Sequence, residues 1–194
     1  KLSAVSPDGD IVETVAAPNT VLPGPPWQHH DLDGLSQWAF STLADLCGRH
    51  PVAHIVTCGH GSGGVLTTAD PDGPGGGAAL PMIDYEQPMP VGLAEVYATL
   101  AGTLQDRGSA IMGASTHQAR QLLWMNKEYP DAVATARWYL GLPQYWSWRL
   151  SGIAVNEYSC MAAQSHFWNV AEQRFAPIVT SQNWGRLMPP FTHA

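Results

Sequence analysis

The chain has 194 residues, enough for one good hydrophobic core and hardly for two. Hydrophobic residues make up 45% of it and charged residues 13%, which excludes a disordered tail. The formal net charge is −7 and there is no run of Lys or Arg, so we expect neither nucleic acid nor an anionic membrane as a partner. No apolar run reaches the ~18 residues of a membrane span. The three cysteines are widely spaced, which favours a reducing cytoplasm over a disulfide framework.

The first predicted elements are two short strands joined by a tight turn. Leu2–Val5 alternates apolar and polar residues, and Ile11–Val15 is rich in β-branched residues. Pro7-Asp8-Gly9 lies between them and is a typical turn sequence. A proline-rich loop over residues 19–27 follows. The chain is therefore predicted to begin with a β-hairpin and a loop.

A helix and another strand are predicted next. Asp31 and Asp33 are candidate N-caps, apolar residues recur at helical spacing over residues 35–46, and Gly48 ends the pattern. The apolar run at residues 54–58 is typical of a short buried strand. We expect this strand and the hairpin to belong to one mixed sheet.

The second half of the chain is predicted to be mostly helical. One helix ends near Tyr129-Pro130, an aromatic helix over residues 145–150 ends at Gly152, and another helix spans roughly residues 171–182. Three residues with helical spacing are expected to be buried structural residues, namely Trp124, Trp146 and Leu150. Strands followed by helices indicate an α/β domain with a helical extension.

The glycine-rich turn at residues 59–64 is the strongest chemical signal, because glycines let a backbone approach a ligand closely. One interpretation is a dinucleotide-binding fingerprint, which requires a helix next. Another is a nucleophile elbow at Ser62, although His60 replaces the first glycine of that pattern. The residues from Val65 onward are typical of a strand, which disfavours both. The remaining interpretations are a strand-turn-strand that faces a small polar ligand, and a tight hairpin without a ligand.

Two other groups of polar residues could bind a ligand. Asp84 and Glu86 are two residues apart on an extended segment, so they share one face and suit hydrogen bonds to sugar hydroxyls. The alternative is a pair of solvated loop charges. His29-His30-Asp31 could begin a metal site, but no third ligand follows at a typical spacing. We interpret these three as exposed polar residues at the start of the helix, and no metal is assigned.

Seven segments, in order along nearly the whole chain, resemble motifs of the FGGY family of carbohydrate kinases. The most specific is Tyr-Trp-Ser-Trp-Arg-Leu-Ser-Gly at residues 145–152, which resembles D-Y-L-x-x-R-L-T-G. Residues 59–63 resemble G-Q-x-H-G, with His60 and Ser62 as replacements. Residues 81–86 resemble P-x-x-W-x-D-x-R, with Asp84 kept and with Met82 and Glu86 as replacements. The other four segments lie at residues 1–9, 113–130, 156–168 and 187–190.

The resemblance implies an α/β fold, an actin-like ATPase or ribonuclease H-like domain with a mixed β-sheet and a helical extension. Residues 1–194 would form the N-terminal sugar-binding domain, cut short at both ends. It would lack the first phosphate-loop strand and the segment with the catalytic Asp, so no catalytic residue is expected here and the fragment alone would be inactive. The full enzyme would phosphorylate a hydroxyl of a ketose or polyol with ATP and Mg²⁺. A second actin-like domain of the same chain would complete the cleft, and a homodimer is left open.

Seven residues are the candidate sugar-binding groups, because imidazole, hydroxyl and carboxylate groups supply both donors and acceptors for a polyol. They are His60, Ser62, Asp84, Tyr85, Glu86, His117 and Gln118. We expect His60 and Asp84 to line one pocket. The alternatives to a kinase are a serine hydrolase that uses Ser62 and a non-catalytic sugar-sensing module.

Overall fold

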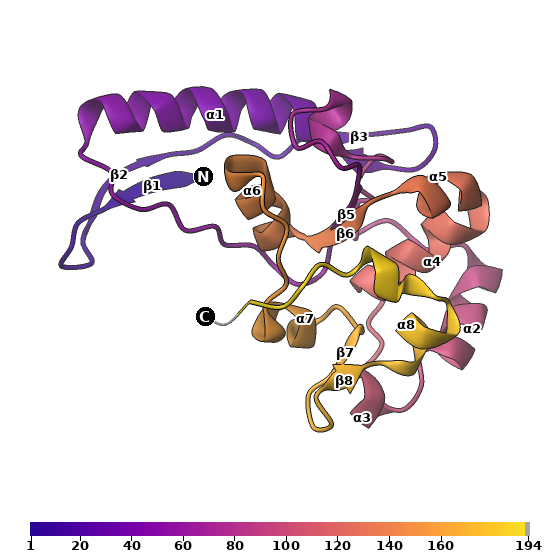
Figure 1. Ribbon diagram of the computed structural model, residues 1–194. Coiled ribbons are helices and arrows are strands. Elements are labelled where there is room, and N and C mark those ends of the chain that lie inside the picture. Colours follow the sequence, from indigo (N-terminus) through magenta and orange to yellow (C-terminus); the bar gives the residue numbers. More distant parts are fainter. Residues whose placement is uncertain (193–194) are drawn as a thin grey trace.

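A computed structural model describes residues 1–192. The long helix α1 (Leu32–Arg49) and the hairpin of β1 (Leu2–Val5) and β2 (Ile11–Val15) lie on one side of the molecule (Figure 1). Most of the shorter helices gather on the other side, with the pair β5 (Gly64–Thr67) and β6 (Trp138–Gly141) between the two (Figure 1). This mixture of helices and strands agrees with the α/β class expected from the sequence.

The predicted hairpin and first helix are confirmed. β1 and β2 pair antiparallel, with Leu2 opposite Val15 and an irregularity between Ala4 and Val5. Helix α1 begins after Asp31, whose carboxylate accepts a hydrogen bond from the backbone N–H of Gly34 at 2.9 Å. At its other end, Arg49 and His50 each lie 2.7 Å from the carboxylate of Glu13 on β2. The helix is thereby fixed to the hairpin at the surface.

The predicted strand at residues 54–58, and the single mixed sheet that would contain it, are wrong for the part of the chain that is described. Strands within residues 1–192 form four two-stranded antiparallel sheets, β1–β2, β3–β4, β5–β6 and β7–β8. Residues 51–58 are extended but have no strand beside them, because an apolar groove of about 220 Å³ separates Leu2 on β1 from Ile55 and Val56. Val56 is 85% exposed as a result.

Two short strand pairs position the candidate site. One is β3 (Val21–Leu22) with β4 (His29–His30), and the other is β5 with β6. β5 is buried along its whole length, and its residues Gly64 and Thr67 lie opposite Gly141 and Trp138. A small core packs between these strands, α1 and α6 (Leu142–Ser151). The prediction of a strand directly after the glycine-rich turn is therefore confirmed.

The larger core lies among the shorter helices, as the sequence indicates. These are α2 (Val91–Leu100), α3 (Leu104–Arg107), α4 (Gln118–Glu128), α5 (Pro130–Thr135), α7 (Tyr158–Ala163) and α8 (Pro177–Ser181), with 3-10 helices at Pro74–Gly77 and Trp184–Leu187. The predicted end of a helix near Tyr129 is confirmed, and so is the end of α6 at Gly152, which has a left-handed φ of 73°. Tyr97, Trp124, Phe167 and Trp184 are buried members of this core.

The predicted helix over residues 171–182 is largely wrong. β7 (Trp168–Asn169) and β8 (Arg174–Phe175) form a hairpin there, and only the short α8 follows. The side chain of Asn169 accepts a hydrogen bond from the backbone N–H of Glu172, which closes the turn. Pro177 cannot continue a helix from the preceding residues, but it is well suited to begin one.

The prediction of buried tryptophans is confirmed for Trp124 only. Trp146 is half-buried and Leu150 is 38% exposed, so these two expectations are wrong. Trp148, at 1% exposure, is the core residue of α6. Residues two positions apart lie about 200° apart around a helix, so Trp146 and Trp148 face different ways. Trp146 and Leu150 line the apolar groove beside β1.

Candidate functional site

The glycine-rich turn ends where the backbone packs closely against side chains. A Cβ on Gly64 would lie 2.5 Å from Cε1 of Tyr139, and a Cβ on Gly63 would lie 2.8 Å from Cε of Met82. The Tyr139 ring leaves no room for a side chain at Gly64, whereas at Gly63 the close atom is the end of the flexible Met82 side chain, which could shift. The close packing brings the turn against β6 and against the segment that carries Asp84.

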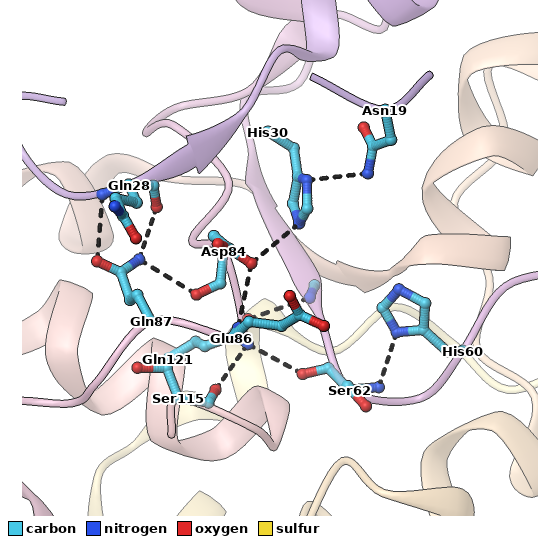
Figure 2. A network of polar contacts seen from close by, with 11 residues as sticks. Asn19, Gln28, His30, His60, Ser62, Asp84, Glu86, Gln87, Ser115 and Gln121 are labelled. Carbon is cyan, nitrogen blue, oxygen red and sulfur yellow. Dashed lines mark hydrogen bonds and ion pairs between the residues drawn. The ribbon is translucent and has the colours of Figure 1, made fainter. Parts of the chain in front are cut away.

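A single buried amide holds this turn in place (Figure 2). The Nε2 of Gln121 on α4 donates to the backbone carbonyls of Ser62 and Ser115, each at 2.9 Å. Its Oε1 accepts from the backbone N–H of Gly64 and from the hydroxyl of Tyr139, each at 3.3 Å. All four hydrogen bonds available to a glutamine side chain are therefore made inside the protein.

His60 and Ser62 lie on the turn itself. The backbone N–H of Ser62 donates to Nδ1 of His60 at 3.3 Å, so the proton of the neutral ring lies on Nε2. The His60 ring contacts the Tyr85 ring at a centroid distance of 4.6 Å, and partial loss of hydration lowers the pKa of His60. Neutral His60 thus presents an Nε2–H donor beside Tyr85.

Asp84 is a buried carboxylate with incomplete hydrogen bonding. Its side chain is 10% exposed, and its Oδ1 accepts from the backbone N–H of Glu86 at 3.1 Å. The backbone N–H of Asp84 donates to the carbonyl of Gln28 at 2.9 Å, which fixes the segment against β4. Within residues 1–192, no hydrogen bond is donated to Oδ2 of Asp84. Oδ2 is not among the fully enclosed side-chain atoms that lack a partner, so this oxygen reaches the surface and is open to a donor from a ligand or from water.

His30 on β4 lies beside Asp84, although it was not among the candidate sugar-binding residues of the sequence (Figure 2). Its Nε2 is 3.8 Å from Oδ1 of Asp84, and its Nδ1 is 3.0 Å from Nδ2 of Asn19. Burial lowers the pKa of His30, and the nearby Asp84 carboxylate partly opposes this shift. The interpretation of His29-His30-Asp31 as exposed residues at a helix start is correct in that Asp31 caps the helix, but wrong on exposure, because His30 is buried and the other two residues are half-buried.

The predicted residues do not all line one cavity. A hollow of about 210 Å³ opens on one side of the turn and is lined by His60, Gln118, Gln144 and Cys160, among others, but not by Asp84 or Ser62. The amide of Gln118 donates to the carbonyl of Gly61 at 3.2 Å. Asp84 and the exposed Glu86 do not line this hollow, and neither does Tyr85, whose ring contacts His60.

His117 lies away from this group and is fully buried. Its Nδ1 donates to the carbonyl of Gln164, and its Nε2 accepts from the backbone N–H of Met112, both at 2.9 Å. Its ring stacks on His166 at a centroid distance of 3.6 Å. Both ring nitrogens are thus used inside the protein, which favours a structural role for this residue.

The geometry disfavours a serine hydrolase. The hydroxyl of Ser62 donates to Oε1 of Gln164 at 2.9 Å, and only the backbone of Ser62 contacts the His60 ring. A serine nucleophile needs a histidine that accepts the hydroxyl proton, and within residues 1–192 none is in hydrogen-bond contact with Ser62 Oγ. Gln164 is a further polar residue of the turn that sequence reasoning missed, because its loop follows α7 and is distant in the chain.

Two searches of the described residues concern metals and membranes. No cluster of three or more His, Cys, Asp or Glu side chains within residues 1–192 could hold a metal ion. None of the helices in this range is long and apolar enough to cross a membrane.

Comparison with solved structures shows which proteins share this fold. A carbohydrate kinase from Novosphingobium aromaticivorans matches with a TM-score of 0.87 and 27% identity, over 99% of this chain and 40% of that one. A ligand-bound xylulose kinase from Lactobacillus acidophilus matches with a TM-score of 0.75 and 14% identity, over 98% and 39%. A xylulose kinase from Rhodospirillum rubrum matches with a TM-score of 0.70 and 19% identity, over 97% and 40%. No family profile and no curated protein sequence matches the chain.

The chain therefore has the mixed α/β fold of one part of a sugar kinase and spans about 40% of the length of the matching kinases. The resemblance to FGGY carbohydrate kinases, inferred from motifs in the sequence, is confirmed by this likeness over nearly the whole chain.

Proposed function

We propose that this chain is the sugar-binding part of an ATP-dependent carbohydrate kinase that phosphorylates a hydroxyl of a ketose or polyol. The observation that carries the proposal is the Asp84 carboxylate, buried and short of a donor, in a chain with the fold of a sugar kinase. A sugar hydroxyl is a donor that can satisfy such an oxygen. The domain would be of the actin-like type, with a second such domain closing the site.

Each polar group near Asp84 has a defined part in this proposal. Asp84 Oδ2 accepts a hydrogen bond from one sugar hydroxyl, and the Nε2–H of His60 donates to another. Tyr85 and Glu86 border the same space, while Gln118 lines the hollow on the far side of His60. Donors and acceptors arranged in this way reject substrates that lack the matching hydroxyl.

ATP and Mg²⁺ belong to the remainder of the proposed enzyme. A phosphoryl transfer needs carboxylate ligands for the metal and a base for the attacking hydroxyl. The described residues contain no cluster of three or more acidic, His or Cys side chains for a metal. The residues here are thus assigned to binding and orienting the sugar, and no step of the transfer is assigned to them.

The apolar groove supports the proposal that residues 1–194 are one domain without its first strand. The groove separates β1 from residues 55–58, and its lining includes Leu35, Trp38, Ile55, Val56 and Trp146. Exposed apolar side chains between two extended segments favour a further strand in that position. We propose that an upstream strand of a longer chain fills it.

The experiment is the substitution Asp84→Asn in the longer enzyme. Loss of a charge-assisted hydrogen bond, worth about 1.5–3 kcal/mol, should raise the KM for the sugar by about 10- to 150-fold. The KM for ATP should stay nearly unchanged, because ATP would occupy the other side of the cleft. Steady-state kinetics with a panel of ketoses and polyols measures both constants.

Asp131→Asn is the matched control, because Asp131 is exposed in the first turn of α5. It should leave both constants unchanged. Wild-type sugar kinetics in Asp84→Asn would contradict the assignment of Asp84. Sugar binding without any phosphate transfer by the wild-type enzyme would instead support a sugar-sensing module.

A further inference from the structure

A chain of polar contacts leads from the exposed Asn19 through the buried His30 to Asp84, and neither Asn19 nor His30 is among the proposed sugar contacts (Figure 2). Asn19 precedes β3, His30 lies on β4, and Asp84 follows the segment bonded to β4. The backbone N–H of His30 donates to the carbonyl of Met82 at 3.1 Å, so the His30 ring is held close to Asp84.

The contacts define which ring nitrogen of His30 carries the proton. An amide Nδ2 is only a donor, so Asn19 makes Nδ1 of His30 an acceptor. The proton of the neutral ring must then lie on Nε2, which points at Oδ1 of Asp84 from 3.8 Å. Nε2 is buried and has no hydrogen-bond partner in the described part of the chain. Its favourable interaction is with the carboxylate that it faces.

The same carboxylate is restrained from a second direction. Oδ1 of Asp84 accepts from the backbone N–H of Glu86, while Oδ2 is the oxygen without a donor among residues 1–192. One hydrogen bond, from the backbone N–H of Glu86, and the electrostatic contact with the His30 ring at 3.8 Å both act on Oδ1, and together they restrain the rotation that determines where Oδ2 points. A buried imidazole with an otherwise unsatisfied N–H is costly unless such an interaction offsets the cost.

We propose that His30, held in its Nε2–H form by Asn19, is a positioning residue that orients Asp84 Oδ2 toward a sugar hydroxyl. This inference rests on the proposed function and adds a residue pair that recognises the sugar indirectly. His30 contacts Asp84 and not the sugar, because its Nε2 is buried. The ring acts as a donor of fixed direction, which a side chain of similar volume without an N–H cannot replace.

The test compares two substitutions of similar size in the longer kinase. His30→Leu removes the donor and should raise the KM for the sugar on the order of tenfold, with the KM for ATP unchanged, because misdirection of a binding group weakens substrate orientation. His30→Gln can place an amide Nε2–H near the original donor, so its sugar KM should return to within about threefold of the wild-type value. If Leu and Gln give the same sugar KM, the inference is overturned and the residue only fills space.

A second variant tests the direction of the proton. Asn19→Asp turns the donor at position 19 into an acceptor, which moves the ring proton to Nδ1 and leaves a lone pair facing Asp84. Its sugar KM should rise at high pH and recover as the pH falls and the ring becomes doubly protonated, unlike that of the wild type. The charged or titratable groups near His30 in the wild type are Asp84, Glu86, His29 and His60; the variant keeps them and adds only the carboxylate at position 19. Parallel pH profiles for wild type and Asn19→Asp would count against the proposal.

Nitrogen NMR of labelled histidine in the wild-type protein tests the role of His30 separately from the proposed function of the chain. The inference requires the Nε2–H form of His30, and detection of the Nδ1–H form overturns it whatever the kinetics. If the wild-type protein neither binds nor phosphorylates a sugar, the proposed function fails and the role of His30 in sugar binding fails with it. The NMR experiment needs no sugar, so the Nδ1–H form of His30 would overturn this inference alone and leave the proposed function standing.

Discussion

The helical region and the N-terminal layer of this chain bury their apolar side chains to very different degrees. Around α2, α4, α5 and α8, aromatic residues such as Tyr97, Phe167 and Trp184 are at most 1% exposed. In the layer formed by β1, β2 and residues 51–58, Ile11, Ile55 and Val56 are at least 49% exposed. The first region buries its apolar side chains in a core, whereas the second exposes them at the surface.

The boundary between these regions passes through helix α6. Trp148 packs into the inner core with Tyr145, while Trp146 and Leu150 line the groove beside β1. The two regions thus meet at α6, which contributes one face to each. The difference between the faces shows that the other described elements bury the Trp148 face of the helix and leave the Trp146 face beside the groove.

The largest effect is expected at this boundary. Trp148→Ala should lower the free energy of unfolding by about 3–5 kcal/mol, because it empties a fully enclosed site. Trp146→Ala is the matched control, and should cost about 1 kcal/mol or less since its ring already borders solvent. Urea unfolding of the two variants measures the difference. Equal costs would show that the faces of α6 are not distinct.

The buried histidine pair of the helical region should make that region sensitive to acid. Burial lowers the pKa of His117 to about 4 and that of His166 to about 3, against about 6.5 in an unfolded chain. The unfolded chain therefore binds protons that the folded chain excludes, and stability that is fully present above pH 6.5 falls as the pH drops below it. The free energy of unfolding should decrease by about 2 kcal/mol between pH 6.5 and pH 5.5 for the pair together.

Thermal unfolding at a series of pH values measures this loss, and carboxylates contribute little in the window because their ordinary pKa values are near 4. Proton NMR supplies the control, since neither ring should titrate above pH 5 in the folded chain. Titration of His117 or His166 near pH 6.5 would contradict the assignment.

The smallest effect concerns the exposed face of the N-terminal layer. Val56→Ser should change the stability of residues 1–194 by about 0.5 kcal/mol or less, because Val56 already borders solvent. In a longer chain whose upstream strand covers the groove, the same change should cost about 1–2 kcal/mol. Val91→Ser on the exposed side of α2 should stay small in both chains. A similar effect of Val56→Ser in both would argue against the upstream strand.

Elements with local chemical signals were predictable from the sequence. The hairpin follows from Pro7-Asp8-Gly9, α1 from its cap Asp31, and the end of α6 from Gly152. The absence of a strand at residues 54–58 was not predictable, because a strand forms only where a partner strand pairs with it, and an apolar run does not show whether a partner is present. The helix expected over residues 171–182 failed because Asn169 and Pro177 favour a turn and a new helix start.

The site follows the same division. The sequence predicted one pocket lined by His60 and Asp84. In the structure the ring of Tyr85, the neighbour of Asp84, contacts His60, whereas Asp84 does not line the hollow beside His60. The roles of His30 and Gln164 could not, because each reaches the site through contacts with residues distant in the chain. Only the fold shows that Asn19 selects the proton position of His30.

The four hydrogen bonds of Gln121 have a consequence for how a ligand would be received. They tie the turn to α4 and β6 before any ligand arrives, so the backbone around Ser62 has little freedom left to lose. Ordering a mobile loop on binding reduces affinity, because the entropy lost must be offset by contacts. A turn held in this way binds as a rigid template, with fast association and little change of shape. Selectivity among sugars would then come from the fixed spacing of polar groups rather than from closure of the loop.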